Sequence, residues 1–265
     1  MSAELIAAYA GGSVTQAALV ARGGVRCIPK PLRALRHPLF AALPLLALVG
    51  VVFWLRASPD GAVTLAKLAL LGVPLLALIA AARTGRIALA LMLAMLVVTL
   101  RDGHSLAGQV AALGMIAASC TVLGALLVEV TPPRWLGAGI AATAAVDLVL
   151  VASGLLAPAT LALDSAGVTE SLPQLQRVEL GPLTMGYADL FLPALVGALL
   201  ATQVRTRRWV ALLTLCFALA AGSLFLVTDR LPATVPVALA LLVVEGAGAI
   251  VPPWRHAVDG SPKST

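Results

Sequence analysis

The sequence predicts an all-α membrane protein, a bundle of about eight transmembrane helices. Three observations predict this class. Charged residues make up 11% of the 265 residues, whereas soluble domains carry about 25%. The mean hydropathy is high, at +1.01. The apolar residues gather in runs of the roughly 20 residues that a helix needs to cross the hydrocarbon core. A soluble globular enzyme, a disordered chain and a fibrous repeat are therefore excluded.

The predicted spans follow one another with short connections. They cover residues 38–56, 62–82, 86–100, 105–128, 135–157, 183–203, 208–228 and 232–251. The third span is short, and we expect Arg86 to extend it by reaching back to the membrane surface. Residues 4–21 allow three interpretations, since they are less apolar than the spans. They could form an amphipathic helix on the membrane surface, a disordered tail or a ninth membrane helix.

The basic residues predict the orientation, because cytoplasmic loops of membrane proteins are enriched in Lys and Arg. If both termini are cytoplasmic, the inner segments hold 13 of the 18 basic residues and the outer loops hold 4. The outer four are Arg56, Arg101, Arg177 and Arg230, and Lys67 lies within a span. We therefore expect an integral membrane protein with both termini in the cytoplasm. The excess of Arg over Lys is typical of a GC-rich bacterial source, which favours a prokaryotic plasma membrane.

This topology divides the chain into four parts. They are a basic N-terminal segment (1–37), a four-helix membrane part (38–130), a second membrane part (131–251) and a cytoplasmic tail (252–265). The long loop, residues 158–182, faces outward in this arrangement. It contains several charged residues and three prolines, so we expect it to be irregular. A loop of this length is often functional.

Four ionisable residues fall inside predicted spans, where an Asp at the centre costs about 2.5–3.5 kcal/mol. Lys67 is close enough to a span end to snorkel, and a polar bond between helices accounts for Glu245. Asp147 lies at the centre of its predicted span, and Asp189 lies at a similar depth in the next one. Because consecutive spans are usually neighbours, the two carboxyl groups are predicted to meet inside the bilayer.

A pair of carboxyl groups in a low-dielectric site has a distinctive chemistry. Both groups cannot ionise together, so one of them keeps a proton. The ionised group can take a proton from a water molecule, and the protonated group can donate to a peptide carbonyl. Such a pair could hydrolyse a peptide bond without a metal or cofactor. The same residues also fit a proton-coupled transporter or a purely structural acid pair, and these alternatives stay open at this point.

Three short segments resemble the presenilin and signal peptide peptidase family of intramembrane aspartyl proteases. They are Val146-Asp147-Leu148-Val149, Gly186-Tyr187-Ala188-Asp189 followed by Pro193, and Pro232-Ala233-Thr234-Val235-Pro236. The second is similar to the family's Gly-x-Gly-Asp motif, and the proline after it resembles the signal peptide peptidase branch. The third is similar to the family's Pro-Ala-Leu motif. The resemblance covers about residues 135–250, and the order of the segments also matches.

The resemblance implies a presenilin-like arrangement of helices and an intramembrane aspartic endopeptidase. Asp147 and Asp189 would be its catalytic residues. The residues expected to shape the substrate site are Gly186, Tyr187, Ala188, Pro193, Pro232, Ala233 and Thr234. The partners would be the lipid bilayer and helical substrates, either transmembrane peptides or signal peptides. The outward loop between the acids matches the polarity of signal peptide peptidase, which favours substrates with a cytoplasmic N-terminus.

The sequence also departs from the family's pattern. Ala188 replaces the second glycine of the Gly-x-Gly-Asp motif, Val146 replaces a tyrosine, and Thr234 replaces the leucine of the Pro-Ala-Leu motif. The family generally has nine spans, whereas eight are predicted here. None of these departures removes an acid. A catalytically inactive homologue is therefore an alternative.

The prolines and the glycine of these segments have physical consequences. Pro193 lacks an N–H, so the carbonyl group of Asp189 would lose its usual helical partner. Gly186 would let an extended substrate approach Asp189. Pro232 and Pro236 would loosen the start of the last span, and an unwound segment beside the acids could pair with a substrate strand.

Other function classes fit less well. A prepilin peptidase usually places a lysine soon after its motif Asp, whereas Leu190 and Phe191 follow Asp189. A transporter built from repeats would show matching halves, and none are found. The sequence lacks a phosphate-binding loop and a zinc helix, so neither a metal nor a cofactor is expected. The basic residues lie in short loops, as topology alone requires, so nucleic acid is not an expected partner. The oligomeric state is left open.

Overall fold

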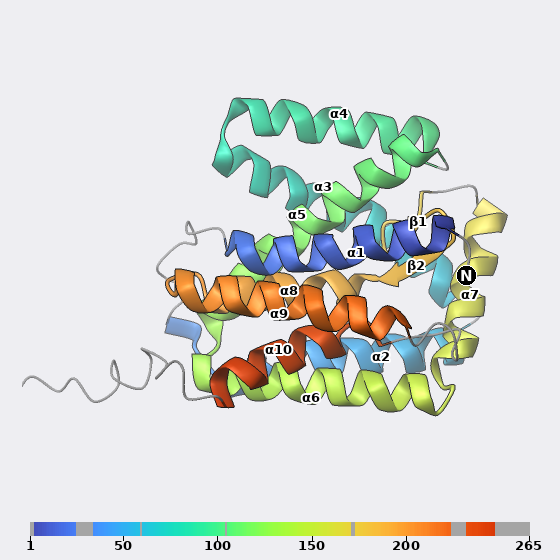
Figure 1. Cartoon of the computed structure of the whole chain (residues 1–265). Coiled ribbons are helices and arrows are strands. Elements are labelled where there is room, and N and C mark those ends of the chain that lie inside the picture. The colour runs from blue at the N-terminus through green and yellow to red at the C-terminus, as the bar shows by residue number, and fades with distance from the viewer. Residues whose placement is uncertain are drawn as a thin grey trace, which may run out of the picture.

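The computed structural model describes residues 3–24, 34–58, 60–103, 105–170, 173–223 and 232–246. The chain forms a bundle of helices with one short β-hairpin at one end (Figure 1). The predicted all-α class is confirmed. The cytoplasmic tail predicted for 252–265 lies outside the described residues.

The helices follow the predicted spans closely in the first half of the chain. They are α1 (Ala3–Arg22), the 3-10 turn η2 (Pro38–Ala42), α2 (Leu43–Ala57), α3 (Gly61–Thr84), α4 (Arg86–Asp102), α5 (Leu106–Val130), α6 (Pro133–Ala152), α7 (Leu156–Glu170), α8 (Tyr187–Leu199), α9 (Val204–Gly222) and α10 (Val235–Gly246). Between α7 and α8, strand β1 (Arg177–Leu180) pairs antiparallel with β2 (Leu183–Gly186). The register joins Arg177 to Gly186 and Leu180 to Leu183.

Four helical segments of the described residues are long and apolar enough to cross a membrane. They are Pro38–Ala57, Gly61–Thr84, Leu106–Val130 and Pro133–Ala152. They coincide with the first, second, fourth and fifth predicted spans. The other four predicted spans contain α4, α8, α9 and α10, which are shorter or more polar. Eight crossings and a presenilin-like arrangement therefore stay predictions.

The expectation of an irregular loop over 158–182 is wrong. The first part of this segment is helix α7, and its last part contributes the hairpin. Its apolar residues explain the helix, because buried Ala159 packs in one cluster with Leu55 of α2 and Ala62 of α3. The sixth predicted span also begins too early. Residues 183–186 are strand β2, and the helix starts at Tyr187.

Helix α8 lies at the centre of the bundle and contacts both α1 and α5. All its residues from Leu192 to Leu199 are buried, whereas its first three residues, 187–189, are partly exposed. Glycines allow the close packing. A Cβ at Gly124 of α5 would lie 3.0 Å from the backbone nitrogen of Leu195, and one at Gly197 would lie 2.9 Å from the carbonyl oxygen of Val20.

Helix α1 decides between the interpretations of residues 4–21. It runs alongside α8 and α9, with its first residues at the hairpin end of the bundle (Figure 1). The direction agrees with two close contacts, since Gly12 in the middle of α1 packs on Met185 of β2 and Gly24, just after α1, packs on Ala198 of α8. A disordered tail is therefore excluded. The burial of Gln16 and Val20 in the bundle favours a membrane helix over a helix lying on the membrane surface.

Candidate functional site

Asp147 lies on α6 and is buried, at 7% exposure. The hydroxyl group of Thr234 donates a hydrogen bond to its Oδ2 atom at 2.5 Å, and the backbone N–H of Thr234 interacts with the same carboxylate. Thr234 belongs to the turn before α10 and is fully buried. The segment that resembles the Pro-Ala-Leu motif therefore contacts the first predicted catalytic acid directly.

The position of Asp147 differs from the prediction in one respect. Helix α6 ends at Ala152, so Asp147 lies about 7.5 Å from the end of the helix at 1.5 Å per residue. The predicted span continued to residue 157 and placed the acid at its centre. The difference arises because Ser153 and Gly154 form the turn that leads into α7, and Gly154 has a positive φ of 69°.

Asp189 is the third residue of α8. The backbone N–H of Gly186 donates to its Oδ2 atom at 2.8 Å, an arrangement that satisfies an otherwise unpaired N–H at the helix start. Unlike Asp147, Asp189 is partly exposed in the isolated chain. It also follows β2 directly, so the hairpin fixes the entry of the chain into α8.

The two acids lie on helices that contact each other, α6 and α8. Asp189 lies at the start of α8 and Asp147 near the end of α6, so both are at the hairpin end of the bundle. The turn 232–234 joins them, because Thr234 holds Asp147 while its neighbour Ala233 is linked to Asp189. Three segments that are far apart in the sequence are thus connected around Asp147 and Asp189, and the predicted meeting of the two carboxyl groups stays a prediction.

Ala233 and Asp189 are linked by Gln16 of α1. The Nε2 atom of Gln16 donates to the carbonyl oxygen of Asp189 at 2.9 Å and to that of Ala233 at 3.0 Å. The helical partner of the Asp189 carbonyl would be the N–H of residue 193, which Pro193 lacks. The expectation of a freed carbonyl is therefore confirmed, and the side chain of Gln16 supplies the missing donor.

The remaining predicted residues lie around this centre. Tyr187 and Ser119 of α5 share a hydrogen bond of 2.9 Å between their hydroxyl groups. Ala188 is partly exposed, and Pro193 is buried inside α8. Pro232 precedes α10 and accepts a bond from the N–H of Val235. The predicted loosening of this end is confirmed, because residues 232–234 are not helical.

Nothing in the described part of the chain requires a glycine at position 186. Gly186 has an ordinary extended backbone with φ of −71°. A Cβ there would lie 3.5 Å from Oδ2 of Asp189, a normal van der Waals contact. Gly186 is exposed, so any close approach that it allows must come from a molecule outside the chain.

Sequence reasoning missed Gln16 and Tyr9. The phenol group of Tyr9 donates to the carbonyl oxygen of Ala218 at 2.7 Å, and Tyr9 also interacts with the charge of Asp189. A signal was present in the sequence, because Gly12, Ser13 and Gln16 place small and polar residues on one face of α1. Such a face packs poorly against lipid and well against other helices.

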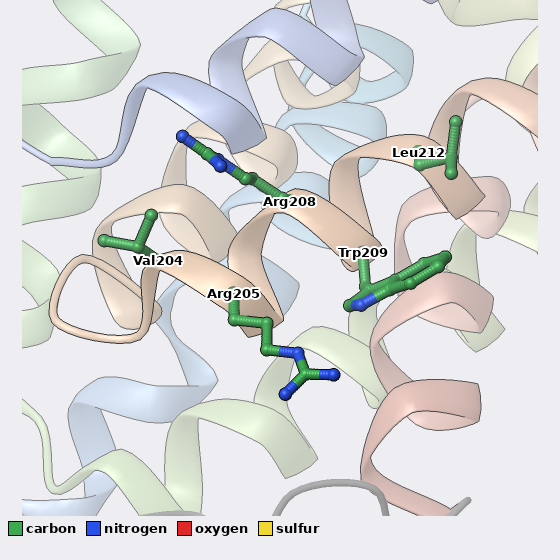
Figure 2. A pocket seen from close by; sticks show the side chains of 5 residues that line it. All are labelled: Val204, Arg205, Arg208, Trp209 and Leu212. Carbon is green, nitrogen blue, oxygen red and sulfur yellow. The ribbon is translucent and has the colours of Figure 1, made fainter.

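Other features of the described residues do not compete with this site. No group of three or more His, Cys, Asp and Glu side chains that could hold a metal is found among them. A surface depression is lined by Val204, Arg205, Arg208, Trp209 and Leu212, all from α9 (Figure 2). Because a single helix supplies its whole lining, this depression is the outer face of α9.

Comparison with known proteins gives no identification. No protein family, no curated protein and no solved structure is significantly similar to this chain. The function is therefore argued from the site itself.

Proposed function

We propose that this protein is an intramembrane aspartyl protease that uses Asp147 and Asp189 as its catalytic pair. One observation carries the proposal: Thr234, in the turn resembling the Pro-Ala-Leu motif, donates to Asp147, and Gln16 links the neighbouring Ala233 to the backbone of Asp189. The order of these parts agrees with the resemblance to the presenilin and signal peptide peptidase family.

The chemistry divides between the two carboxyl groups. The ionised group takes a proton from a water molecule, whose oxygen attacks the carbonyl carbon of the scissile peptide. The protonated group donates to the carbonyl oxygen. The C–N bond then breaks, and the amine leaves with a proton returned from the pair. The two acids act as one titrating unit throughout. No metal or covalent intermediate is required.

The substrate class follows from the surroundings of Asp189. A transmembrane helix shields its own peptide groups, so a substrate must unwind before water can attack it. Strand β2 leads directly into Asp189, and in the two-stranded sheet of the described residues only one of its edges pairs with β1. An unwound substrate could add to the other edge of β2. Transmembrane peptides and signal-peptide remnants are the substrates we propose.

The packing of α1 also revises the proposed topology. At 1.5 Å per residue, its 20 residues extend about 30 Å, the thickness of a bilayer core. If α1 crosses the membrane, it supplies the ninth helix that the family resemblance requires. Its Ala3 end then lies on the outer side with the hairpin, whereas the basic residues after Arg22 stay inside. The proposed setting is a prokaryotic plasma membrane, with the segment after α10 in the cytoplasm.

An inactive homologue is the second candidate, and one observation favours it. Each acid already has a hydrogen-bond partner within the protein, Thr234 for Asp147 and Gly186 for Asp189. Such bonds account for buried acids without catalysis. A proton-coupled transporter is the third candidate. It differs from the protease and the inactive homologue because it must move a solute together with protons across the membrane.

Cleavage in liposomes tests the proposal. The purified protein is reconstituted with a tagged single-helix substrate of about 20 Ala and Leu residues, and the products are identified by mass spectrometry. We expect cleavage by the wild type and none by Asp147→Asn or Asp189→Asn. Asp60→Asn is the matched control, because the Asp60 side chain makes no capping bond at the start of α3. A well-folded wild type that cleaves no helix would overturn the proposal, and proton-coupled flux without cleavage would favour the transporter.

A further inference from the structure

Gln16 is the point where α1 meets both halves of the proposed catalytic site. Its side chain is buried, at 2% exposure. The two hydrogen atoms of one amide nitrogen are directed at two backbone oxygens, those of Asp189 and Ala233. An amide group has two such donors, so both are used. The two acceptors belong to segments more than 40 residues apart in the sequence.

The requirement for this donor is created by Pro193. A buried carbonyl group without a partner is unfavourable, and Pro193 removes the partner that Asp189 would have in a regular helix. Residues of α8 alone cannot replace it. Gln16 therefore supplies the hydrogen-bond donor that the Asp189 carbonyl group lacks because of Pro193.

The position of the second acceptor gives the bond a further consequence. Ala233 precedes Thr234, whose hydroxyl group donates to Asp147. A continuous path thus runs from the backbone of Asp189 through the Gln16 amide and residues 233–234 to the carboxylate of Asp147. The separation of the two acids is set by this path as well as by the packing of α6 against α8.

We propose that Gln16 is a positioning residue for the acid pair, which holds the start of α8 and the turn before α10 in the register that brings Asp147 and Asp189 together. The effect of Gln16 on catalysis presupposes the proposed protease function, whereas the link between the two segments does not. Gln16 touches no reacting atom. It gives α1, which lies outside the segments that resemble the protease family, a direct role in the reaction.

The first test replaces the donor while keeping the volume of the side chain. Gln16→Leu and Gln16→Glu are compared with the wild type in the liposome cleavage assay. We expect kcat to fall by about 100-fold in Gln16→Leu, as for a misplacement of about 1 Å, with KM unchanged. Gln16→Glu should lose activity as well, because a carboxyl group offers at most one donor, whereas the Gln16 amide supplies two. Unchanged kcat in both variants would overturn the proposal.

A matched control is available one turn earlier on the same face. Ser13 is also buried, but its hydroxyl group donates to the carbonyl oxygen of Tyr9 within α1. Ser13→Ala therefore removes a buried polar group without breaking a link between helices, and it should leave kcat unchanged. An equal loss in Ser13→Ala and Gln16→Leu would mean that α1 contributes only packing, which contradicts a specific role of Gln16.

A second substitution separates positioning from general stability. Pro193→Ala restores an N–H at the position that can bind the Asp189 carbonyl within α8. The loss of kcat caused by Gln16→Leu should therefore be smaller in the Pro193→Ala background than in the wild type. If the two effects simply multiply, Gln16 does not act through this carbonyl, and the proposal is wrong.

A measurement that needs no substrate can test the role of Gln16 independently of the proposed protease activity. Hydrogen–deuterium exchange of the reconstituted protein is followed over 187–199 and 232–246. We expect faster exchange in both segments in Gln16→Leu than in Ser13→Ala, with the other helices unchanged. If Gln16→Leu exchanges faster but the wild type cleaves no substrate, the link made by Gln16 is supported and only the protease function is rejected. Equal exchange in the two variants would reject the link itself.

Discussion

The hydroxyl group of Thr234 donates a hydrogen bond of 2.5 Å to the carboxylate of Asp147, from a residue 87 positions away in the sequence. Thr234 stands where the resembled family has an apolar leucine. The departure is therefore not neutral, because it introduces a donor next to one of the two acids. The bond ties the turn before α10 to α6.

Thr234→Val should weaken the site, since valine has nearly the same shape and no hydroxyl group. A hydrogen bond to a charged group contributes about 1.5–3 kcal/mol, so we expect a loss of unfolding free energy of that order. Cleavage should fall together with it. Thr234→Ser keeps the donor and should retain most of both. Thermal unfolding in detergent and the liposome assay measure the two effects, and a Thr234→Val protein as stable and active as Thr234→Ser would contradict this role.

Tyr187→Phe tests how much the hydrogen bond between Tyr187 and Ser119 contributes to the stability of the protein. The substitution removes the hydroxyl group that shares a bond with Ser119 and keeps the ring. The expected loss of stability is about 0.5–1.5 kcal/mol, the usual net contribution of such a bond. Ser119→Ala should produce a similar loss, and the double variant should lose little more than either single one. Additive losses in this double-mutant cycle would show that the two residues are not coupled.

Ala188→Gly restores the second glycine of the Gly-x-Gly-Asp motif. Ala188 is partly exposed and precedes Asp189 in the sequence, so a smaller residue at this position would leave more room next to the acid. We expect kcat/KM to rise in Ala188→Gly, while the glycine lowers the stability of α8 by up to about 1 kcal/mol. Kinetics and thermal unfolding on the same preparation would show the two opposite changes. Lower kcat/KM would mean that the methyl group is part of the working site.

The pH dependence of cleavage should be bell-shaped. The proposed chemistry needs one proton on the acid pair, so activity is lost when both groups are protonated and when both are ionised. A profile of kcat/KM against pH in liposomes tests this. A rate that rises steadily to one plateau would indicate a single titrating group and argue against a shared proton.

Cysteine labelling should place the start of α1 on the outer side of the membrane. Glu4→Cys, in a background without the native cysteines, is expected to react with an impermeant maleimide added to intact cells. A cysteine at Arg22 should react only after the membrane is opened. The reverse pattern, or protection of both sites, would contradict the proposal that α1 crosses the bilayer.

The sequence predicted the parts of the fold that depend on local composition. The long apolar helices α3, α5 and α6 lie where uninterrupted hydrophobic runs occur. Helix α8 was harder to place, because residues 183–186 contain no charged residue or proline that would separate them from the helix that follows. A strand and a helix differ little in such a short run, and the register with β1 decides between them.

The sequence indicated those candidate site residues that are unusual inside a transmembrane helix. Asp147 and Asp189 are conspicuous because charge is expensive in lipid, and Pro193 identified the freed carbonyl. Gln16 could not be assigned in the same way. Its role depends on the packing of α1 against α8, at glycines whose tight contacts are set by tertiary structure. Helix α1 also carries buried polar residues, Ser13 and Gln16, on a face that is covered by protein.

The most direct test of the central claim is the affinity of the reconstituted protein for a peptide whose scissile bond is replaced by a hydroxyl-bearing transition-state mimic. Such mimics bind at least about 100-fold more tightly than matched substrates when a catalytic site recognises them. We predict that advantage over the same peptide without the hydroxyl group for the wild type, and its loss in both Asp147→Asn and Asp189→Asn. Equal affinity of the wild type for the two peptides would contradict the claim that the two acids act together on one peptide bond.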